Sequence, residues 1–471
     1  MNFLRAARVF YDKVGGMSES SEPRFSWWLL LRLCTFQIGS AMGDILVTSI
    51  WNRIMIVNFG FPALPVGLLI ALRYLLSPLS LYAGFRSDTT KFLGLQRASY
   101  IWLGRGLMVA SFPLLGFSVT LFDADTNNPL GWLLALLSFV LYGTGTLLSG
   151  SPFFALVRDV MPPARQGLAL SVIETALILL FPIMAITFSV ILREYTLTGF
   201  WELIALTAVV GGFFWFFAIV GVEKRAAFYK AAEHTQTKAR AQFHEFHHTF
   251  AKIFQDPRAR AFMVFLAVAT FAGWMQDAIL EPFGAEVLNA TLAQTTRYSS
   301  TWQGATALVL ILAVIIWRKR KPEQQTPIAQ FGLGIMGLGM LWLALTALSQ
   351  ISWMVNPALL VFGIGFGLYT FSAFQLLVVM TFDQAAGAYL GLWTVTILLS
   401  RGVGIFSGGA LRDLLHAVTQ SFPFAYGAIF GLEALGLFVS IYLLTRVNIL
   451  GFARATGRIP AADAQVITAE L

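Results

Sequence analysis

The chain carries little charge for its length. Asp, Glu, Lys and Arg make up 12% of its 471 residues, and hydrophobic residues make up 57%. A soluble domain carries about 25% charged residues. This scarcity argues against an ordinary water-soluble domain and indicates a protein that lies mostly in lipid.

Several other features are missing. Cys34 is the only cysteine, so an intrachain disulfide is impossible. The first 26 residues are polar and the first apolar run is too long for a signal peptide, so we expect no cleaved signal. Walker A, GxSxG and HExxH motifs are lacking. We therefore expect neither an enzyme site nor an ATP-driven pump.

Long apolar runs dominate what remains. A helix of about 20 apolar residues spans the hydrocarbon core of a bilayer. Twelve segments meet this requirement, and the sequence therefore predicts an all-α polytopic membrane protein. We place the spans near residues 27–56, 62–84, 98–121, 130–156, 166–192, 199–221, 260–283, 301–317, 328–349, 355–381, 386–408 and 423–446.

The basic residues lie mainly on one side of these spans. With the N-terminus inside, the inside segments hold 24 Lys and Arg, whereas the outside loops hold Arg193, Arg297 and Arg412. The positive-inside rule then predicts twelve spans with both termini cytoplasmic. The net charge of +8 is explained by this bias and by contact with anionic membrane lipid, so we expect no nucleic-acid partner.

The spans form two groups of six. We expect a cytoplasmic tail (1–26), a six-helix bundle (27–221), a cytoplasmic connector (222–259), a second six-helix bundle (260–446) and a cytoplasmic tail (447–471). Phenylalanines at spacings of three and four in the distal connector, Phe243 to Phe254, predict an amphipathic helix on the membrane surface. His244 and His248 lie four apart there, but no second ligand cluster accompanies them, so we expect no metal site.

The two groups resemble each other weakly. Met42-Gly43-Asp44 in the first span aligns with Met275-Gln276-Asp277 in the seventh. Two six-helix halves joined by a basic linker resemble the major facilitator fold, in which the substrate site lies at midplane between the halves. GxxxG pairs, Gly363/Gly367 and Gly404/Gly408, predict close helix approach.

Two loops on the predicted cytoplasmic side are candidate gating segments. Residues 84–97 read GFRSDTTKFLGLQR, which resembles a cytoplasmic motif of major facilitators, and residues 158–167 read RDVMPPARQG. The simpler alternative for the first is a tight basic loop. We expect Arg158 and Asp159 to be able to pair. The candidate gating residues are Gly84, Asp88, Arg97, Arg158, Asp159 and Arg165.

Charged residues inside the spans are the candidate site. Asp277 and Glu281 lie four apart, which predicts that both face one side of a helix. Ionisable residues in a membrane are costly and face a cavity or a partner. Two interpretations remain open: a cavity that binds a headgroup, a metal-bearing ligand or a proton, and buried ion pairs that fix helix register. The candidates are Asp44, Glu174, Gln276, Asp277 and Glu281, with Arg73, Arg105 and Arg401 as counter-charges.

The segments QDAILEPFG (276–284), YIWLGRG (100–106) and the two loops resemble the PucC family, the bacteriochlorophyll-delivery branch of the major facilitator superfamily. Gln276, Asp277, Glu281 and Pro282 match its most specific element. The resemblance implies a location in the inner (photosynthetic) membrane of a chlorophototrophic bacterium. It also implies a role in assembling light-harvesting complexes, by delivering bacteriochlorophyll or chlorophyll or by docking antenna polypeptides. The implied partners are those polypeptides and a chlorophyll or bacteriochlorophyll synthase.

The histidines modify this expectation. The five histidines lie outside the predicted spans, although histidine is the usual ligand of chlorophyll magnesium. Oxygen ligands such as Asp44, Asp277 or Glu281 suit magnesium, and a transiently bound pigment would fit. Two alternatives remain: a proton-coupled secondary transporter of an amphipathic solute, and a structural subunit of a photosynthetic complex.

Overall fold

The computed structural model describes residues 25–80, 95, 97–162, 165–223, 255–317, 322–381 and 386–455. Twelve helices within these ranges are long and apolar enough to cross a membrane, as predicted. The amphipathic helix of the connector, predicted across 243–254, and both chain ends lie outside the described residues. The spans are Trp27–Asn58, Ala63–Ser80, Ala98–Ala124, Pro129–Val160, Gln166–Ile191, Leu197–Ile219, Pro257–Ala278, Leu292–Trp317, Thr326–Ser349, Ser352–Val379, Tyr389–Thr419 and Phe422–Arg446.

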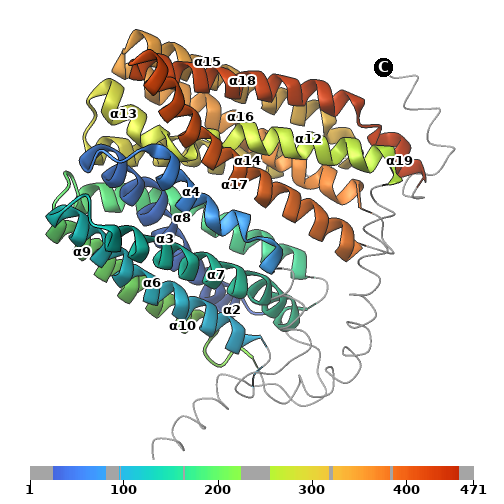
Figure 1. The fold of residues 1–471 in the computed structure, drawn as a ribbon. Helices are drawn as coiled ribbons and strands as arrows, with labels where there is room; N and C mark the ends of the chain where they lie inside the picture. Colours follow the sequence, from blue (N-terminus) through green and yellow to red (C-terminus); the bar gives the residue numbers. More distant parts are fainter. Residues whose placement is uncertain are drawn as a thin grey trace, which may run out of the picture.

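Two groups of helices lie side by side (Figure 1). The first half contains α2 (Trp27–Cys34), α3 (Phe36–Ile45), α4 (Ala63–Leu75), α6 (Ala98–Ala124), α7 (Pro129–Val160), α8 (Gln166–Ile191), α9 (Leu197–Leu206) and α10 (Gly212–Ile219). The second half contains α12 (Pro257–Trp274), α13 (Leu280–Leu288), α14 (Leu292–Trp317), α15 (Thr326–Ser349), α16 (Val355–Val379), α17 (Ala386–Thr419) and α18 (Phe422–Arg446), followed by α19 (Ile449–Ala455).

Local sequence fixes where several helices begin. The side chains of Asn128, Asp256 and Ser421 accept hydrogen bonds from the first turns of α7, α12 and α18. Proline follows within the first turn of each of these helices. The first N–H groups of a helix have no partner inside it, so a polar cap stabilises the start and proline is tolerated there.

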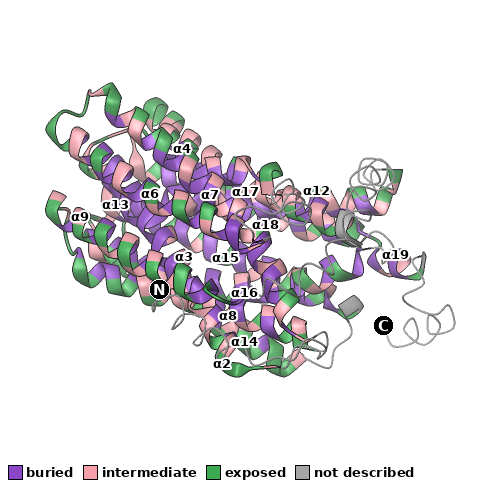
Figure 2. Ribbon diagram, turned by 90° about the horizontal axis from the view of Figure 1, so that it is seen from below, coloured by how far each residue is buried: buried purple, intermediate pink, exposed green. Residues whose placement is uncertain are grey.

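Apolar packing and an apolar surface explain how the bundle sits in lipid. Buried residues lie on the helix faces that meet inside the bundle, and exposed ones lie on its outside (Figure 2). The exposed positions include many Leu, Ile and Phe side chains. Such a surface would be costly in water but matches hydrocarbon chains. The least buried of the twelve spans is Gln166–Ile191, in which 17% of an apolar 18-residue stretch is buried.

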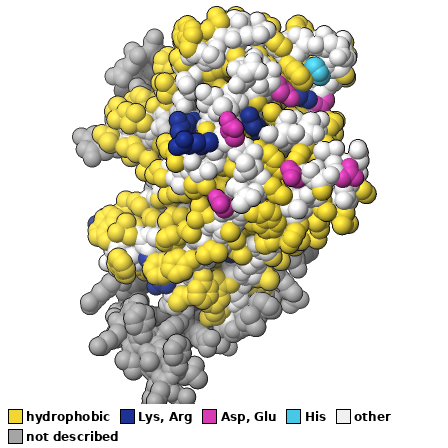
Figure 3. Space-filling view, turned by 90° about the vertical axis from the view of Figure 1, so that its left-hand side faces the viewer, with side chains coloured by type: hydrophobic (Ala, Val, Ile, Leu, Met, Phe, Trp, Pro, Cys, Tyr) yellow, Lys and Arg dark blue, Asp and Glu magenta, His cyan; other side chains and the backbone are white. Residues whose placement is uncertain are grey.

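We call the end of the bundle where α4, α7, α14 and α18 begin the distal end; the described chain starts and ends at the opposite, termini end. The distal end is a surface of apolar and uncharged polar side chains with a few charged ones (Figure 3).

Glycines let α17 lie between the two halves. A Cβ on Gly404 would meet the carbonyl oxygen of Phe271 at 2.6 Å, and one on Gly408 would meet that of Met275. On another side, a Cβ on Gly409 would meet the carbonyl oxygen of Ala63 at 2.5 Å. The close approach predicted for Gly404 and Gly408 is confirmed, and α17 packs closely on both α12 and α4.

The eleventh span is longer than predicted. It was expected to end at 408, but α17 continues to Thr419. Arg412 and His416 therefore lie in a helix, and so does Arg297, in α14. The reason is that Arg412 is buried and neutralised by ion pairs with Glu286 and Asp413, so its charge does not end the helix.

A charged cavity between the two halves

The seventh span is broken at the QDAILEPFG segment. Helix α12 ends at Trp274, a 3-10 turn η5 (Met275–Ala278) follows, and α13 begins at Leu280. The prediction of one continuous helix through Asp277 and Glu281 is therefore wrong. The break leaves carbonyl groups without helical partners, and Nδ2 of Asn52 in the other half donates to the Ala278 oxygen at 2.9 Å. Broken helices of this kind form binding sites in transporters.

A cavity of about 200 Å³ lies at this break, between the two halves. Both halves contribute to its lining, through α3, η1 (Leu46–Trp51) and α8 on one side and α12, η5, α13, α14, α16 and α17 on the other. Asp44, Gln276, Asp277, Glu281 and Arg401 all line it. The sequence therefore identified residues that the fold brings together from separate helices.

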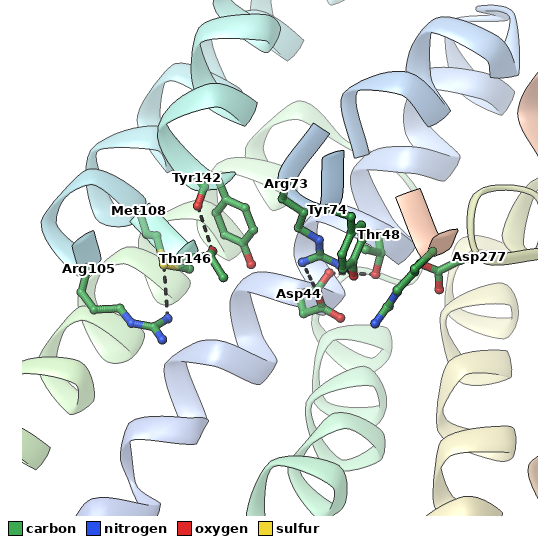
Figure 4. Close-up of polar contacts among 10 residues, drawn as sticks. Asp44, Thr48, Arg73, Tyr74, Arg105, Met108, Tyr142, Thr146 and Asp277 are labelled. Atoms are coloured by element: carbon green, nitrogen blue, oxygen red, sulfur yellow. Dashed lines mark hydrogen bonds and ion pairs between the residues drawn. The ribbon is translucent and has the colours of Figure 1, made fainter. Parts of the chain in front are cut away.

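Two ion pairs lie at the cavity, one in each half. Arg73 on α4 hydrogen-bonds and pairs with Asp44 on α3 (Figure 4). Arg401 on α17 pairs with Asp277 across 3.5 Å between Nη2 and Oδ2, a looser contact without a hydrogen bond. Pairing reduces the cost of keeping these charges out of water. The interpretation of these residues as buried ion pairs thus has direct structural support.

Tyr74 connects the two pairs. Its ring lies 4.5 Å from the guanidinium carbon of Arg73 and 4.4 Å from that of Arg401. Arg401 also lies over the ring of Trp274, at 3.3 Å from its centroid. Two cations thus stack on one aromatic ring, each with its own carboxylate. The charged row Asp44, Arg73, Tyr74, Arg401 and Asp277 therefore crosses the boundary between the halves.

Glu281 has a different environment. It is 3% exposed, and its Oε1 accepts a hydrogen bond of 2.9 Å from the Ser299 hydroxyl. The Ser299 hydroxyl lies 3.0 Å from that of Ser49 in the other half. Within the described ranges no Lys or Arg forms an ion pair with Glu281. The side chain in direct contact with this carboxyl group is the neutral Ser299 hydroxyl, and Arg53 acts on Glu281 without forming an ion pair with it.

Two predicted residues lie away from the cavity lining. Ile178 and Phe181 of α8 line the cavity. Glu174 precedes them by four and seven residues, so it lies on the same face of α8 but nearer the termini end. Arg105 was predicted to be a counter-charge, and this is wrong. Its guanidinium carbon lies 4.3 Å from the Phe36 ring centroid and 4.8 Å from that of Trp215, so aromatic faces replace a carboxylate.

The candidate gating loops are only partly described. Gly84 and Asp88 lie outside the described residues. Asp159 pairs with Arg97, which joins the start of α6 to the end of α7. Arg158 is exposed, and Arg165 lies 5.7 Å from the ring centroid of Phe25.

Glu223 was not singled out from the sequence. Its carboxylate accepts hydrogen bonds from the backbone nitrogens of Arg97, at 3.2 Å, and Ala98, at 2.6 Å. It therefore caps α6 from a distant part of the chain. Ser49, Asn52 and Ser299 were also missed, and the only signal available was their polarity within apolar runs.

Contacts across the halves continue toward the distal end. Nη2 of Arg53 donates to the Ala290 carbonyl oxygen at 3.1 Å, and the Ala293 nitrogen donates to the Arg193 carbonyl oxygen at 3.1 Å. Asp413 on α17 accepts hydrogen bonds from the first turn of α4. Together these contacts join the two halves toward the distal end.

A model of the PUCC protein family matches residues 50–452. The chain belongs to this family. The membership predicted from QDAILEPFG and its companion segments is confirmed.

Relatives match this PUCC-family chain over most of its length. Protein PucC of Rhodovulum sulfidophilum is 29% identical over 400 residues, which cover 82% of this chain and 85% of that protein. The bacteriochlorophyll synthase 44.5 kDa chain of Rhodobacter capsulatus is 26% identical over 448 residues, which cover 93% and 99%.

Solved transporter structures share the fold of this PUCC-family chain. A D-xylose-proton symporter superposes with a TM-score of 0.65 at 15% identity, covering 88% of this chain and 98% of the symporter. An inward-facing bacterial homologue of the lysosomal transporter Spinster gives a TM-score of 0.61 at 13% identity, covering 92% and 96%. The predicted major facilitator fold is confirmed.

Proposed function

We propose that this protein is a non-enzymatic assembly factor for photosynthetic light-harvesting complexes in a bacterial inner membrane. It delivers bacteriochlorophyll or chlorophyll, or docks antenna polypeptides. The observation that carries the proposal is the PUCC family match, which runs from within the first span to beyond the last. A relative named as a bacteriochlorophyll synthase chain supports a connection with pigment, and a pigment synthase is the partner we propose beside the antenna polypeptides.

The central cavity is not the place where pigment fits. Its volume of about 200 Å³ lies below the roughly 300–1,000 Å³ of pockets for drug-sized ligands. A chlorophyll, with its tetrapyrrole ring and long tail, is larger than such a ligand. The distal contacts and the ion pairs also hold the cavity walls together. We therefore place pigment or polypeptide contact on the lipid-facing surface.

One aromatic surface suits this role. We define the α2–α10 patch as the exposed residues Trp27, Trp28, Phe213, Phe216 and Phe217. Arg32 joins the two helices: its Nη2 donates to the Phe217 carbonyl oxygen at 2.7 Å, and its guanidinium lies over the Phe217 ring at 5.1 Å. Trp28 is 72% exposed and lies one turn before Arg32. Flat aromatic side chains can stack against a tetrapyrrole ring or pack on a partner helix.

Complementation tests the proposal. A phototrophic bacterium lacking its own PUCC-family protein receives this chain or a variant, and antenna absorbance is measured with the amount of protein in the membrane. We expect the wild-type chain to restore absorbance and Trp28→Leu with Phe213→Leu to restore less. The matched control is Trp353→Leu, which alters an equally exposed Trp at the distal end (68% exposed). Wild-type chain that inserts but restores no antenna would contradict the proposal.

Purification adds a direct test. The full chain is extracted from native membranes in mild detergent, and its absorption spectrum and co-purifying proteins are recorded. Red or near-infrared pigment bands with antenna polypeptides or a pigment synthase support the assembly role. A colourless fraction without these partners counts against it.

A proton-coupled transporter is the second candidate, because carboxylates line a cavity between the halves of a transporter fold. Liposomes containing the protein and an enclosed pH dye are exposed to a panel of amphipathic solutes. Solute-dependent proton entry that is lost in Asp44→Asn would support transport. Equal dye responses with and without protein would eliminate this candidate for the solutes tested.

A further inference from the structure

The central cavity contains more unpartnered acceptors than donors. Gln276 lines it, is 2% exposed, and its Oε1 has no hydrogen-bond partner among the described residues. The same holds for Oε1 of Gln303, whereas Oδ2 of Asp277, also at the cavity, has only the loose 3.5 Å ion-pair contact with Arg401. A buried polar atom without a partner costs about 1–3 kcal/mol. These two acceptors and the loosely paired Asp277 carboxylate make the cavity complementary to a ligand with several N–H groups.

The charged groups at the cavity also favour a ligand that donates hydrogen bonds and carries positive charge. Asp44 and Asp277 each have an arginine partner, whereas the partner of Glu281 is the Ser299 hydroxyl. Three carboxyl groups, those of Asp44, Asp277 and Glu281, line the cavity beside one lining arginine, Arg401; Arg73 pairs with Asp44 from outside the lining, and Arg53 acts on Glu281 without an ion pair. Among the buried donors that line the cavity in the described ranges, Nε of Arg401 lacks a hydrogen-bond partner, and it belongs to a guanidinium stacked on Trp274. A ligand with a single positive charge would give Glu281 the direct ionic partner that it lacks among the described residues.

The cavity wall favours an organic cation over a metal ion. Trp274, Trp302 and Phe366 form an aromatic cluster whose ring centroids lie 5.5–6.1 Å apart, and all three line the cavity. Aromatic faces attract cations and cover apolar groups. Among the described residues, no group of three His, Cys, Asp or Glu is placed to hold a metal ion. A volume of about 200 Å³ limits the ligand to a small molecule or a headgroup.

We propose that this cavity binds the primary ammonium group of a small amine. Its N–H groups donate to Gln276, Gln303 and Asp277, its charge is balanced by Glu281, and its carbon atoms lie against Trp274, Trp302 and Phe366. The amine comes either from a free solute or from an ethanolamine lipid headgroup, since the chemistry is the same. This inference does not depend on the antenna proposal, because it concerns a separate site and an in vitro measurement.

Matched probes test the chemistry. Purified full-length protein in detergent is titrated at constant ionic strength with butylammonium chloride, and its Tm is followed. Butanol has the same carbon chain without the charge, tetramethylammonium has the charge without N–H groups, and NaCl supplies an inorganic cation. We expect a saturable rise in Tm with butylammonium that exceeds the response to each control. Equal responses to butanol or tetramethylammonium, or no response to butylammonium, would overturn the proposal.

Variants locate the site. Glu281→Gln and Gln276→Leu are expected to raise the Kd of butylammonium about tenfold or more, and a tenfold change corresponds to about 1.4 kcal/mol. Glu202→Gln, at an exposed carboxyl group on α9, should leave the Kd unchanged. Wild-type affinity in the Glu281 variant would show that the amine binds elsewhere and would refute the assignment. If a variant fails to fold, the comparison of butylammonium with its three control probes on the wild-type protein still tests whether an amine binds.

A lipid experiment separates the two sources. Nanodiscs containing phosphatidylethanolamine are compared with nanodiscs containing phosphatidylcholine, whose headgroup lacks N–H groups. A weaker apparent affinity for butylammonium in phosphatidylethanolamine indicates a lipid headgroup in the cavity. Equal affinity in both lipids indicates a free amine. The proposal stands in either case, provided that butylammonium binds.

Discussion

The carboxylate of Asp413 on α17 accepts a hydrogen bond of 2.7 Å from the backbone nitrogen of Leu64 on α4. Its second oxygen accepts one of 2.9 Å from the Ala63 nitrogen. One half of the molecule thus supplies the N-terminal cap of a helix in the other, where a negative charge also favours the helix dipole. This contact is a latch at the distal end, which separation of the halves would break.

Removing the latch should loosen the distal end. We expect Asp413→Ala to lower stability by about 0.5–2 kcal/mol, the usual cost of losing a helix cap. It should also speed modification of Ser49→Cys by a polar maleimide, in a Cys34→Ser background. Ser49 is 1% exposed, so labelling reports opening. Glu202→Gln is the control, and labelling that is no faster in the Asp413 variant would contradict the latch.

The two ion pairs at the cavity should differ in strength. Asp44→Asn leaves Arg73, whose side chain is 8% exposed, beside a neutral amide. Breaking a buried pair in this way costs about 3–5 kcal/mol. Asp277→Asn should cost less, because Arg401 is 20% exposed, its pair is longer, and it keeps its stacking on Trp274. Thermal unfolding in detergent measures both variants, and a larger loss in Asp277→Asn would reverse our ranking.

The close approach of α17 to the broken span predicts a steric effect. A Cβ on Gly408 would collide with the Met275 carbonyl oxygen, so Gly408→Ala should destabilise by about 1–3 kcal/mol. Gly106 on α6 has no atom within 4 Å of its Cβ position. Gly106→Ala should therefore be neutral or slightly stabilising, since alanine favours helix. Equal Tm values for the two variants would mean that α17 can move away from Met275 at little cost in stability.

The start of α12 should respond to acid. Burial alone would raise the pKa of Asp256, but hydrogen bonds from the Arg258 side chain and backbone outweigh it, and the pKa lies below its ordinary value. The charged cap therefore stabilises above the unfolded pKa of about 3.9, and this contribution disappears as pH falls through the lower folded pKa. Asp256→Asn keeps a capping group without the charge.

We expect the stability difference between wild type and Asp256→Asn to be constant above about pH 5 and to shrink below about pH 4. Its size should be under about 1 kcal/mol, because the side chains of Asp256 and Arg258 are 23% and 34% exposed. Tm measured from pH 3 to pH 7 gives the curve. A difference that grows toward low pH would mean that the charge on Asp256 does not stabilise this helix start.

Hydropathy and periodic charge placement were sufficient to predict the spans and the fold, because lipid constrains length and polarity along the chain. They could not predict partners. Arg105 resembles Arg73 in sequence context, yet it packs on Phe36 and Trp215 while Arg73 meets Asp44. Only three-dimensional packing decides which neighbour an arginine has.

The break after Trp274 was missed for a similar reason. The residues from Met275 to Ile279 include neither proline nor glycine, so local sequence favours a continuous helix. The turn depends on a distant donor, Asn52, that satisfies the Ala278 carbonyl group. Asp277 and Glu281 nevertheless line one cavity, so the predicted grouping of these acids was useful although its helical basis was wrong.

The glycines of α17 have a mechanical consequence. Where α17 meets α4, Gly409 lies against the Ala63 carbonyl oxygen, and Gly67 would place a Cβ 3.3 Å from the Ile405 carbonyl oxygen. Backbone meets backbone at these two points, whereas Gly402 of α17 lies against the side chains of Tyr74 and Leu75. Near Gly67 and Gly409, the contact between α4 and α17 is therefore smooth, because no side chain separates the two backbones. Once the Asp413 latch and the other contacts across the halves open, the two bundles can shift by shear along these helices.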